Sequence, residues 1–179
     1  MSSIVISGDT SGAITLSAPA VSGTNTATLP AATGTVMVSG NMPAFSVYTS
    51  TSQSLSSSTA TKIQFNTKVF DTASAFDATT NYRYTPLISG YYQINLNVQM
   101  LATVPTLFQI FIYKNGSNFA YQTNATPSNG NTLSVSQLIY FNGSTDYIES
   151  YGKIAATSGI SIVSDSTSTY FSGSLVRAA

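Results

Sequence analysis

Few residues of this chain have side chains that could carry out catalysis. The sequence has no His and no Cys, which removes the usual general base near neutral pH, the thiolate nucleophile and the commonest metal ligand. One Ser-x-x-Lys pair occurs, at Ser150 and Lys153, and such a pair works on a helix, where residues three apart share a face. Here it ends a predicted strand, on which the two side chains diverge. We therefore expect that the protein is not an enzyme.

Five acidic residues are the candidates for acid–base chemistry or calcium binding: Asp71, Asp77, Asp146, Glu149 and Asp165. Glycoside cleavage needs two carboxyl groups that face each other across the bond, whereas Asp146 and Glu149 lie on or beside a strand and point to opposite faces. Calcium takes oxygen ligands, but the chain has no run of the EF-hand type. Turn capping and solvent exposure are the favoured interpretation of these acids. We expect no cofactor and no metal, and calcium stays open as an alternative.

The overall composition excludes several classes of partner. The net charge is zero and only 7% of the residues are charged, whereas nucleic-acid binding needs clustered Lys and Arg and adsorption to an anionic membrane needs a polybasic surface. No apolar run approaches the ~18 residues of a membrane helix, so we expect no membrane insertion. The N-terminus lacks the basic and apolar regions of a signal peptide. Abundant Ser, Thr, Asn and Gly and scarce Lys and Glu disfavour helices, and we predict an all-β fold.

The strand pattern is clearest from Tyr91 to Met100, where apolar residues occupy every even position and Tyr91 or amide residues occupy every odd position. Successive side chains of a strand lie on opposite faces. One face therefore belongs in a core, and the other is an amide-rich face that accepts water or another subunit. The stretch LFQIFIYK, from Leu107 to Lys114, is apolar on both faces, which predicts burial on both sides or a subunit contact.

Turn signals divide the region from residue 42 to residue 179 into further short strands. Asn115-Gly116 and Asn142-Gly143 are typical of tight hairpin turns, and the Ser/Thr-rich stretch 49–61 is typical of a surface loop. Short strands without helices indicate a sandwich or a jelly roll. The other strands are predicted at Met42–Tyr48, Lys62–Phe70, Tyr82–Thr85, Phe119–Gln122, Leu133–Phe141, Tyr147–Gly152, Ile160–Val163 and Tyr170–Val176.

Residues 1–41 form a separate segment whose only charged residue is Asp9 and which has no aromatic residue. Such a segment cannot build a core alone. A disordered leader is one alternative, and the favoured one is a segment that becomes ordered by pairing with copies of itself or with a larger assembly. The pieces GDTSGAITLSAPA (8–20) and TATLPAATGTV (26–36) resemble a leader common in bacteriophage tail-fibre and virion-surface proteins. Its β-prone pieces are Ile4–Ile6, Ala13–Ser17, Thr26–Leu29 and Thr35–Val38.

The region 42–179 carries a dispersed motif made of Phe65, Asp71, Phe76, Tyr84, Gly90, Tyr92, Ile94 and Leu96. Together with NGSTDYIESY (142–151) and STYFSGSLV (168–176), this motif resembles the globular head of complement component 1q, a branch of the tumour necrosis factor-like jelly rolls. The resemblance implies a ten-stranded, two-sheet jelly roll that assembles as a homotrimer. Four residues are then expected in the trimer interface or in the core: Tyr48, Tyr92, Ile94 and Phe171.

The order of strands also predicts where recognition takes place. If the long strands alternate in direction, the loops 101–106, 124–131 and 154–168 fall at one end and the tight turns at the other, where we also place the leader. Loops on a rigid scaffold are the usual site of recognition. The residues expected to contact a receptor are Thr103, Thr126, Asn129, Asn131, Ser158 and Asp165.

Three functional hypotheses follow. The favoured one is a homotrimeric bacteriophage fibre or spike head on the virion surface, outside the cell after host lysis. It would join other virion proteins through residues 1–41 and contact a host-surface glycan or protein. The second is a capsid decoration protein that binds no receptor. The third, a polysaccharide-depolymerising enzyme, is least favoured because no facing pair of acids can be assigned.

Overall fold

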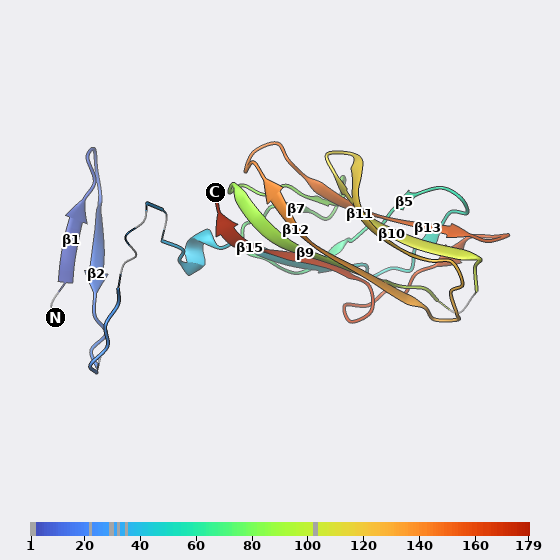
Figure 1. Ribbon diagram of the computed structural model, residues 1–179, viewed down its shortest axis with the longest axis horizontal. Helices are drawn as coiled ribbons and strands as arrows, with labels where there is room; N and C mark the ends of the chain where they lie inside the picture. Colours follow the sequence, from blue (N-terminus) through green and yellow to red (C-terminus); the bar gives the residue numbers. More distant parts are fainter. Residues whose placement is uncertain (1–2, 22, 29–30, 32, 35, 102–103) are drawn as a thin grey trace. The chain divides into compact units, whose positions relative to one another are not determined.

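The computed structural model describes all residues except 1–2, 22, 29–30, 32, 35 and 102–103. The chain divides into two compact units, Met1–Gly34 and Thr35–Ala179, which we describe separately (Figure 1). We call the second unit the head. Met37 packs against the core of the head, and the 3₁₀ turn η1 (Ser39–Asn41) precedes its first strand.

The first unit contains one β-hairpin. Its strands, β1 (Ser3–Ser7) and β2 (Ala13–Ser17), pair in antiparallel fashion. The N–H of Gly8 donates to the Gly12 carbonyl at 3.0 Å, and Gly12 has a φ of 80°, which a residue without Cβ adopts readily. Only the first two of the four expected leader strands are observed. The described residues of the other two, within 26–29 and 35–38, are not strands.

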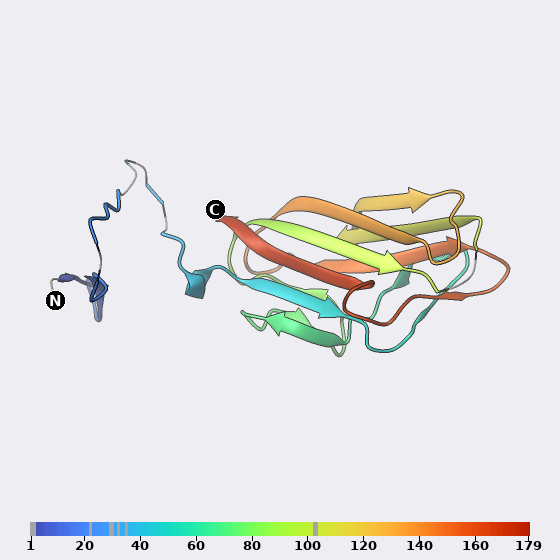
Figure 2. The same cartoon turned by 90° about the horizontal axis from the view of Figure 1, so that it is seen from below.

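The head is an antiparallel two-sheet sandwich, which confirms the predicted all-β class (Figure 2). We call one sheet the front sheet; its order is β12 (Thr132–Phe141), β9 (Gly90–Gln99), β15 (Tyr170–Ala178), β3 (Ala44–Tyr48) and β6 (Thr67–Asp71). The other, the back sheet, has the order β11 (Ser117–Asn124), β10 (Leu107–Lys114), β13 (Ile148–Ala155), β8 (Arg83–Tyr84) and β7 (Phe76–Asp77), with β5 (Thr61–Lys62) also paired to β13. A separate pair joins β14 (Ile160–Ser161) to β4 (Ser54–Leu55).

The core lies between the two sheets and is rich in aromatic rings. Tyr92 and every second residue after it on β9 are at most 1% exposed, which confirms the alternation read from the sequence. The Phe45 ring stacks on Tyr84 at 4.1 Å between centroids and meets Phe171 edge-on at 5.4 Å. Ring pairs of this kind add about 0.5–1.5 kcal/mol each beyond the burial of apolar area. The aromatic residues of the family-like motif therefore act as core residues.

Several strands differ from the expected ranges. The predicted strand Lys62–Phe70 is divided into β5 and β6, because residues 63–66 cross from the back sheet to the front sheet while Ile63 and Phe65 stay fully buried. The described residues of the head contain strands β3 to β15 rather than the expected ten, since several segments pair over only two residues. No helix in the described part of the chain has the length and apolar character needed to cross a membrane.

The two ends of the head differ as the strand order predicted. The end of β9 contacts two of the long loops: Gln99 donates to the Gly130 carbonyl and Leu101 donates to the Ser161 carbonyl. The opposite end carries both tight turns, the C-terminus and η1 (Figures 1 and 2). There the N–H of Leu175 donates to the Pro43 carbonyl at 2.9 Å, so the chain enters the head at the end that has the tight turns.

Candidate functional site

The outward side of the front sheet, here called the amide face, carries the odd-numbered side chains of β9. Gln93 donates to the Ser136 hydroxyl at 2.7 Å, and that hydroxyl donates to Asn95 Oδ1 at 2.7 Å. Ser134 donates in the same way to Asn97, whose own amide donates to the Ser168 carbonyl at 2.6 Å. Because these polar groups are already hydrogen-bonded across β12 and β9, another surface can cover them without leaving them unsatisfied.

One end of the amide face is apolar and exposed. Tyr91 and Tyr140 are register partners whose ring centroids lie 5.4 Å apart. Leu138, on the same strand as Tyr140, is 53% exposed, and Val176, beside Tyr91 in a β-bulge, is 56% exposed. These four residues lie at the tight-turn end of the head. A contiguous set of large apolar side chains on an otherwise polar face marks a surface that favours association.

The four residues expected at the interface or in the core separate into two groups. Tyr92, Ile94 and Phe171 are 0% exposed in a single chain and belong to the core. Their side chains therefore do not reach an outward surface. Tyr48 is half-buried at the end of β3 and alternates with buried Val47 and Thr49, so it lies on the amide face.

The apolar strand β10 is covered within a single chain. Phe111, on the outward side of the back sheet, is 8% exposed because the rings of Tyr113 and Tyr121 each lie 6.0 Å from it. The sequence left two alternatives for this strand, burial on both sides or a subunit contact. The structure shows burial within a single chain, and no partner subunit is needed for it. The argument for association rests on the amide face instead.

The predicted receptor-contacting residues that the structure describes differ in exposure. Thr126, Asn129 and Ser158 are exposed, whereas Asn131 is half-buried and its backbone carbonyl accepts from the N–H of Met100. Thr103 lies outside the described residues. The stretch 49–61 was expected to be a surface loop, but it contains β4, which pairs with β14 at the end of the head that has the long loops and buries Leu55 completely. The apolar Leu55 within this polar stretch was the sequence signal that could have predicted the strand.

Four of the five acids accept from backbone N–H groups of turns, as the favoured interpretation expected: Asp71, Asp77, Asp146 and Asp165. That interpretation was wrong for Glu149, which is 5% exposed within β13 and pairs with Lys62. Asp165 Oδ1 accepts from the Thr167 hydroxyl and from two backbone N–H groups, and the Thr167 hydroxyl is the main cause that lowers the pKa of Asp165. Asp77 accepts from the backbone N–H groups of residues 79–81, chiefly that of Thr80, which lower its pKa. Among the described residues, no three acidic side chains come together as a metal site.

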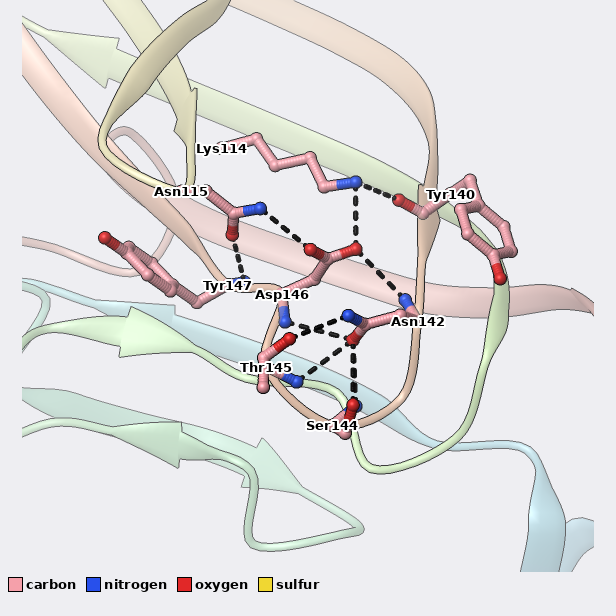
Figure 3. Close-up of polar contacts among 8 residues, drawn as sticks. All are labelled: Lys114, Asn115, Tyr140, Asn142, Ser144, Thr145, Asp146 and Tyr147. Atoms are coloured by element: carbon pink, nitrogen blue, oxygen red, sulfur yellow. Dashed lines mark hydrogen bonds and ion pairs between the residues drawn. The ribbon is translucent and has the colours of Figure 1, made fainter.

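A polar network fixes the tight-turn end of the head (Figure 3). The Asp146 carboxylate accepts from Asn115 at 2.7 Å, from Lys114 at 3.0 Å and from the N–H of Asn142 at 3.1 Å. The Asn115 hydrogen bond is the largest cause that lowers the pKa of Asp146. Asn142 Oδ1 in turn accepts from the backbone N–H groups of residues 144–146. Both hairpin turns are thus tied together, and Asp146 does not face Glu149.

The Ser150–Lys153 pair diverges as expected. Ser150 is 0% exposed and opposite Ile112 on the core side of β13. Lys153 is half-buried and opposite Gln109 on the outward side. The pair therefore has no common site in which one side chain could activate the other.

Sequence reasoning missed the outward side of the back sheet, here called the aromatic face. It is defined by Lys62, Phe111, Tyr113, Tyr121, Glu149, Tyr151 and Lys153, which the strand registers place on one side of β11, β10, β13 and β5. Glu149 is only 5% exposed and pairs with Lys62 at 2.5 Å. The alternation of Glu149, Tyr151 and Lys153 along one strand was the local signal that could have revealed it.

The hairpin of the first unit also has an unexpected apolar side. Register partners share a face of a hairpin, and the pairs Ile4–Leu16 and Ile6–Ile14 therefore put four aliphatic side chains together. Each is more than half exposed. A two-stranded hairpin is marginally stable by itself in water, so this side is suited to packing against another protein surface.

Comparison with known proteins places the fold. No family model matches the chain, and no curated protein matches it. Among solved structures, murine APRIL at pH 5.0 has a TM-score of 0.60 at 10% identity and covers 76% of this chain and 100% of its own. The globular domain of zebrafish complement 1qA has 0.58 at 14%, covering 78% and 100%. The PRD1 vertex protein P5 has 0.59 at 16%, covering 75% and 97%. The head therefore has the jelly-roll fold of the complement 1q and tumour necrosis factor-like head domains.

Proposed function

We propose that this protein is a structural virion head that assembles as a homotrimer through its amide face and recognises the host surface. The observation that carries the proposal is the amide face itself: hydrogen-bonded amides and hydroxyls in the centre, and exposed Tyr91, Leu138, Tyr140 and Val176 at one end. The core of each subunit is complete without a partner. An outward face with this mixture is therefore best explained as a subunit contact.

Small side chains in the centre of the amide face support a close approach of subunits. Ser136, Asn95, Ser172 and Ser46 follow one another in register across four strands. Short hydroxyl side chains allow another backbone to come near, and they keep hydrogen-bonding capacity for groups across the contact. The C1q and tumour necrosis factor-like resemblance implies a threefold arrangement.

The leader supports a virion location. The chain enters the head at the tight-turn end through Pro43. The long loops that contain Thr126 and Ser158 lie at the other end. The apolar side of the β1–β2 hairpin offers a surface for another virion protein. A head attached at one end and carrying exposed loops at the other is suited to contact a host surface. One of the structural neighbours is a vertex protein of PRD1.

The assembly is tested by the mass of the purified protein in solution. We expect light scattering to give the mass of three chains for the wild type and of one chain for Ser172→Arg, because three like charges would be buried together at the centre of the contact. Thr123→Arg, an exposed position on the back sheet, is the matched control and keeps the mass of three chains. A wild-type protein with the mass of one chain would refute the assembly.

A capsid decoration protein is the second candidate, and the hairpin favours it as much as the first. In both cases deletion of residues 1–41 abolishes incorporation into the virion. The two are separated by binding of the purified trimer to intact host cells, which only a receptor-binding head shows. An enzymatic role has no support from any pair of facing acids among the described residues.

A further inference from the structure

The aromatic face holds a buried carboxylate. Glu149 is 5% exposed although its side chain points outward from the back sheet. It accepts from Lys62 Nζ at 2.5 Å and from the Tyr151 hydroxyl at 3.2 Å. A buried carboxylate must be paired or hydrogen-bonded. Glu149 therefore holds Lys62 and the Tyr151 hydroxyl in place, and it is too buried to contact a ligand itself.

Aromatic rings surround this carboxylate in a continuous patch. The registers align Tyr121, Phe111 and Tyr151 in one row across three strands. Tyr113 stacks on Tyr151 at 4.3 Å and lies 6.0 Å from Phe111. Tyr121, on the edge strand, is 56% exposed, so it has the most ring surface available to a ligand. The ring contacts hold the patch in place before any ligand binds.

The charges around the rings leave Lys153 without an ion pair. Lys62 pairs with Glu149. Arg83 on β8 forms no ion pair within the described residues but lies over the Tyr147 ring, 4.5 Å from its centroid. Lys153, on the same side of β13 as Tyr151 and next to Gln109 in register, is half-buried and forms no ion pair within the described part of the chain. This side chain offers a positive charge beside the aromatic patch.

We infer that the aromatic face binds an acidic glycan, an inference that rests on the proposed role in host-surface recognition and names its ligand class. Aromatic rings pack against the apolar C–H faces of sugars, and Gln109 and Lys153 donate to hydroxyls and to a sugar carboxylate. The unmatched Lys153 favours an anionic sugar over a neutral one. The face is on the opposite side of the sandwich from the amide face, so trimer assembly leaves it accessible.

The test measures binding of the full-length protein to an array of bacterial surface polysaccharides that contain uronic or sialic acid, each printed beside its carboxyl-reduced form. We expect binding to acidic members of the array that is weakened about tenfold or more by Tyr121→Ala. Lys153→Gln should bind the acidic and reduced forms about equally. Leu87→Ala removes an equally exposed apolar side chain away from the aromatic face and should bind as the wild type does.

The outcomes separate this inference from the proposed function. If the wild-type trimer binds host cells and Tyr121→Ala and Lys153→Gln bind them equally well, the host-surface role stands and the glycan site is refuted. Absence of binding to every acidic polysaccharide, or equal binding to the reduced forms, also overturns the inference. If the wild-type trimer binds no host cell, the proposed role in host recognition is itself refuted. Thermal unfolding of each variant checks that it is folded.

Discussion

Tyr92 offers the sharpest test of how the head is built, because its ring lies in the core of one subunit and not between subunits. It is 0% exposed, and its ring meets Phe141 edge-on at 5.3 Å and Tyr84 at 6.1 Å. Its hydroxyl donates to the Ile88 carbonyl at 2.8 Å. Burial raises the pKa of Tyr92 to about 12. Both the ring and the hydroxyl are thus used within a single chain.

Two substitutions divide the contribution of this side chain. Tyr92→Phe keeps the ring and removes one hydrogen bond, and it should lower the free energy of unfolding by about 1 kcal/mol. Tyr92→Ala also removes the ring and leaves a cavity, and it should lower that free energy by about 3–5 kcal/mol. Neither change touches the amide face. We therefore expect the folded fraction of each variant to keep the wild-type oligomeric mass.

The assay follows guanidinium unfolding by circular dichroism and the mass by light scattering, at one fixed chain concentration because assembly is linked to stability. The expected result is a lower unfolding midpoint with an unchanged mass before the transition. The reasoning is refuted if Tyr92→Ala dissociates the assembly while the circular dichroism and the unfolding midpoint stay those of the wild type, since Tyr92 would then belong to the subunit contact.

Two further predictions concern an acid and a glycine of the head. Partial burial acts to raise the pKa of Asp71, but the hydrogen bonds from Lys68 and from two backbone N–H groups outweigh it and lower that pKa. The carboxylate therefore contributes its full stabilisation above the unfolded pKa of about 3.9, and this stabilisation is lost as the pH falls through the folded pKa. Asp71→Asn should be less stable at pH 7 yet lose less stability between pH 5 and pH 2, and equal losses in denaturant titrations at these pH values would contradict this. Gly143 has a φ of 73°, and a Cβ there would lie 2.8 Å from the Ile88 carbonyl carbon, so Gly143→Ala should lower the unfolding free energy by about 3 kcal/mol. Its control, Gly116→Ala, has a φ of 78°, but a Cβ there makes only an ordinary contact, with the Tyr147 hydroxyl at 3.6 Å, and this variant should lose only about 1 kcal/mol. Thermal unfolding that ranks the two equally would refute the steric argument.

Much of the fold could be predicted because its signals are local. The alternation along β9 identified the core side chains, and β10 was located with its observed limits of Leu107 and Lys114. The tight turns Asn115-Gly116 and Asn142-Gly143 were also evident, since Gly116 and Gly143 both need a positive φ. The division of 62–70 into two strands was not evident, because alternation continues through Ile63 and Phe65 while the chain changes sheets.

The candidate sites were harder to predict than the fold. The loop residues Thr126, Asn129 and Ser158 were located at the expected end. Tyr92, Ile94 and Phe171 were expected in the trimer interface or in the core, and the structure places them in the core of a single chain. An apolar residue in an alternating strand faces a core in the same way whether one chain or three enclose it. The pattern along one strand therefore carries no information about which of the two applies.

The sequence by itself determined the all-β class, the inward side of each long strand and the positions of the tight turns, because strand alternation and turn chemistry depend on neighbours in the chain. Only the tertiary structure decided which outward side chains share a surface. Tyr121, Phe111, Tyr151 and Lys62 form one row because β11, β10, β13 and β5 pair in a particular register. Such pairing joins segments far apart in the sequence and is set by packing of the whole sandwich, so no local pattern contains it.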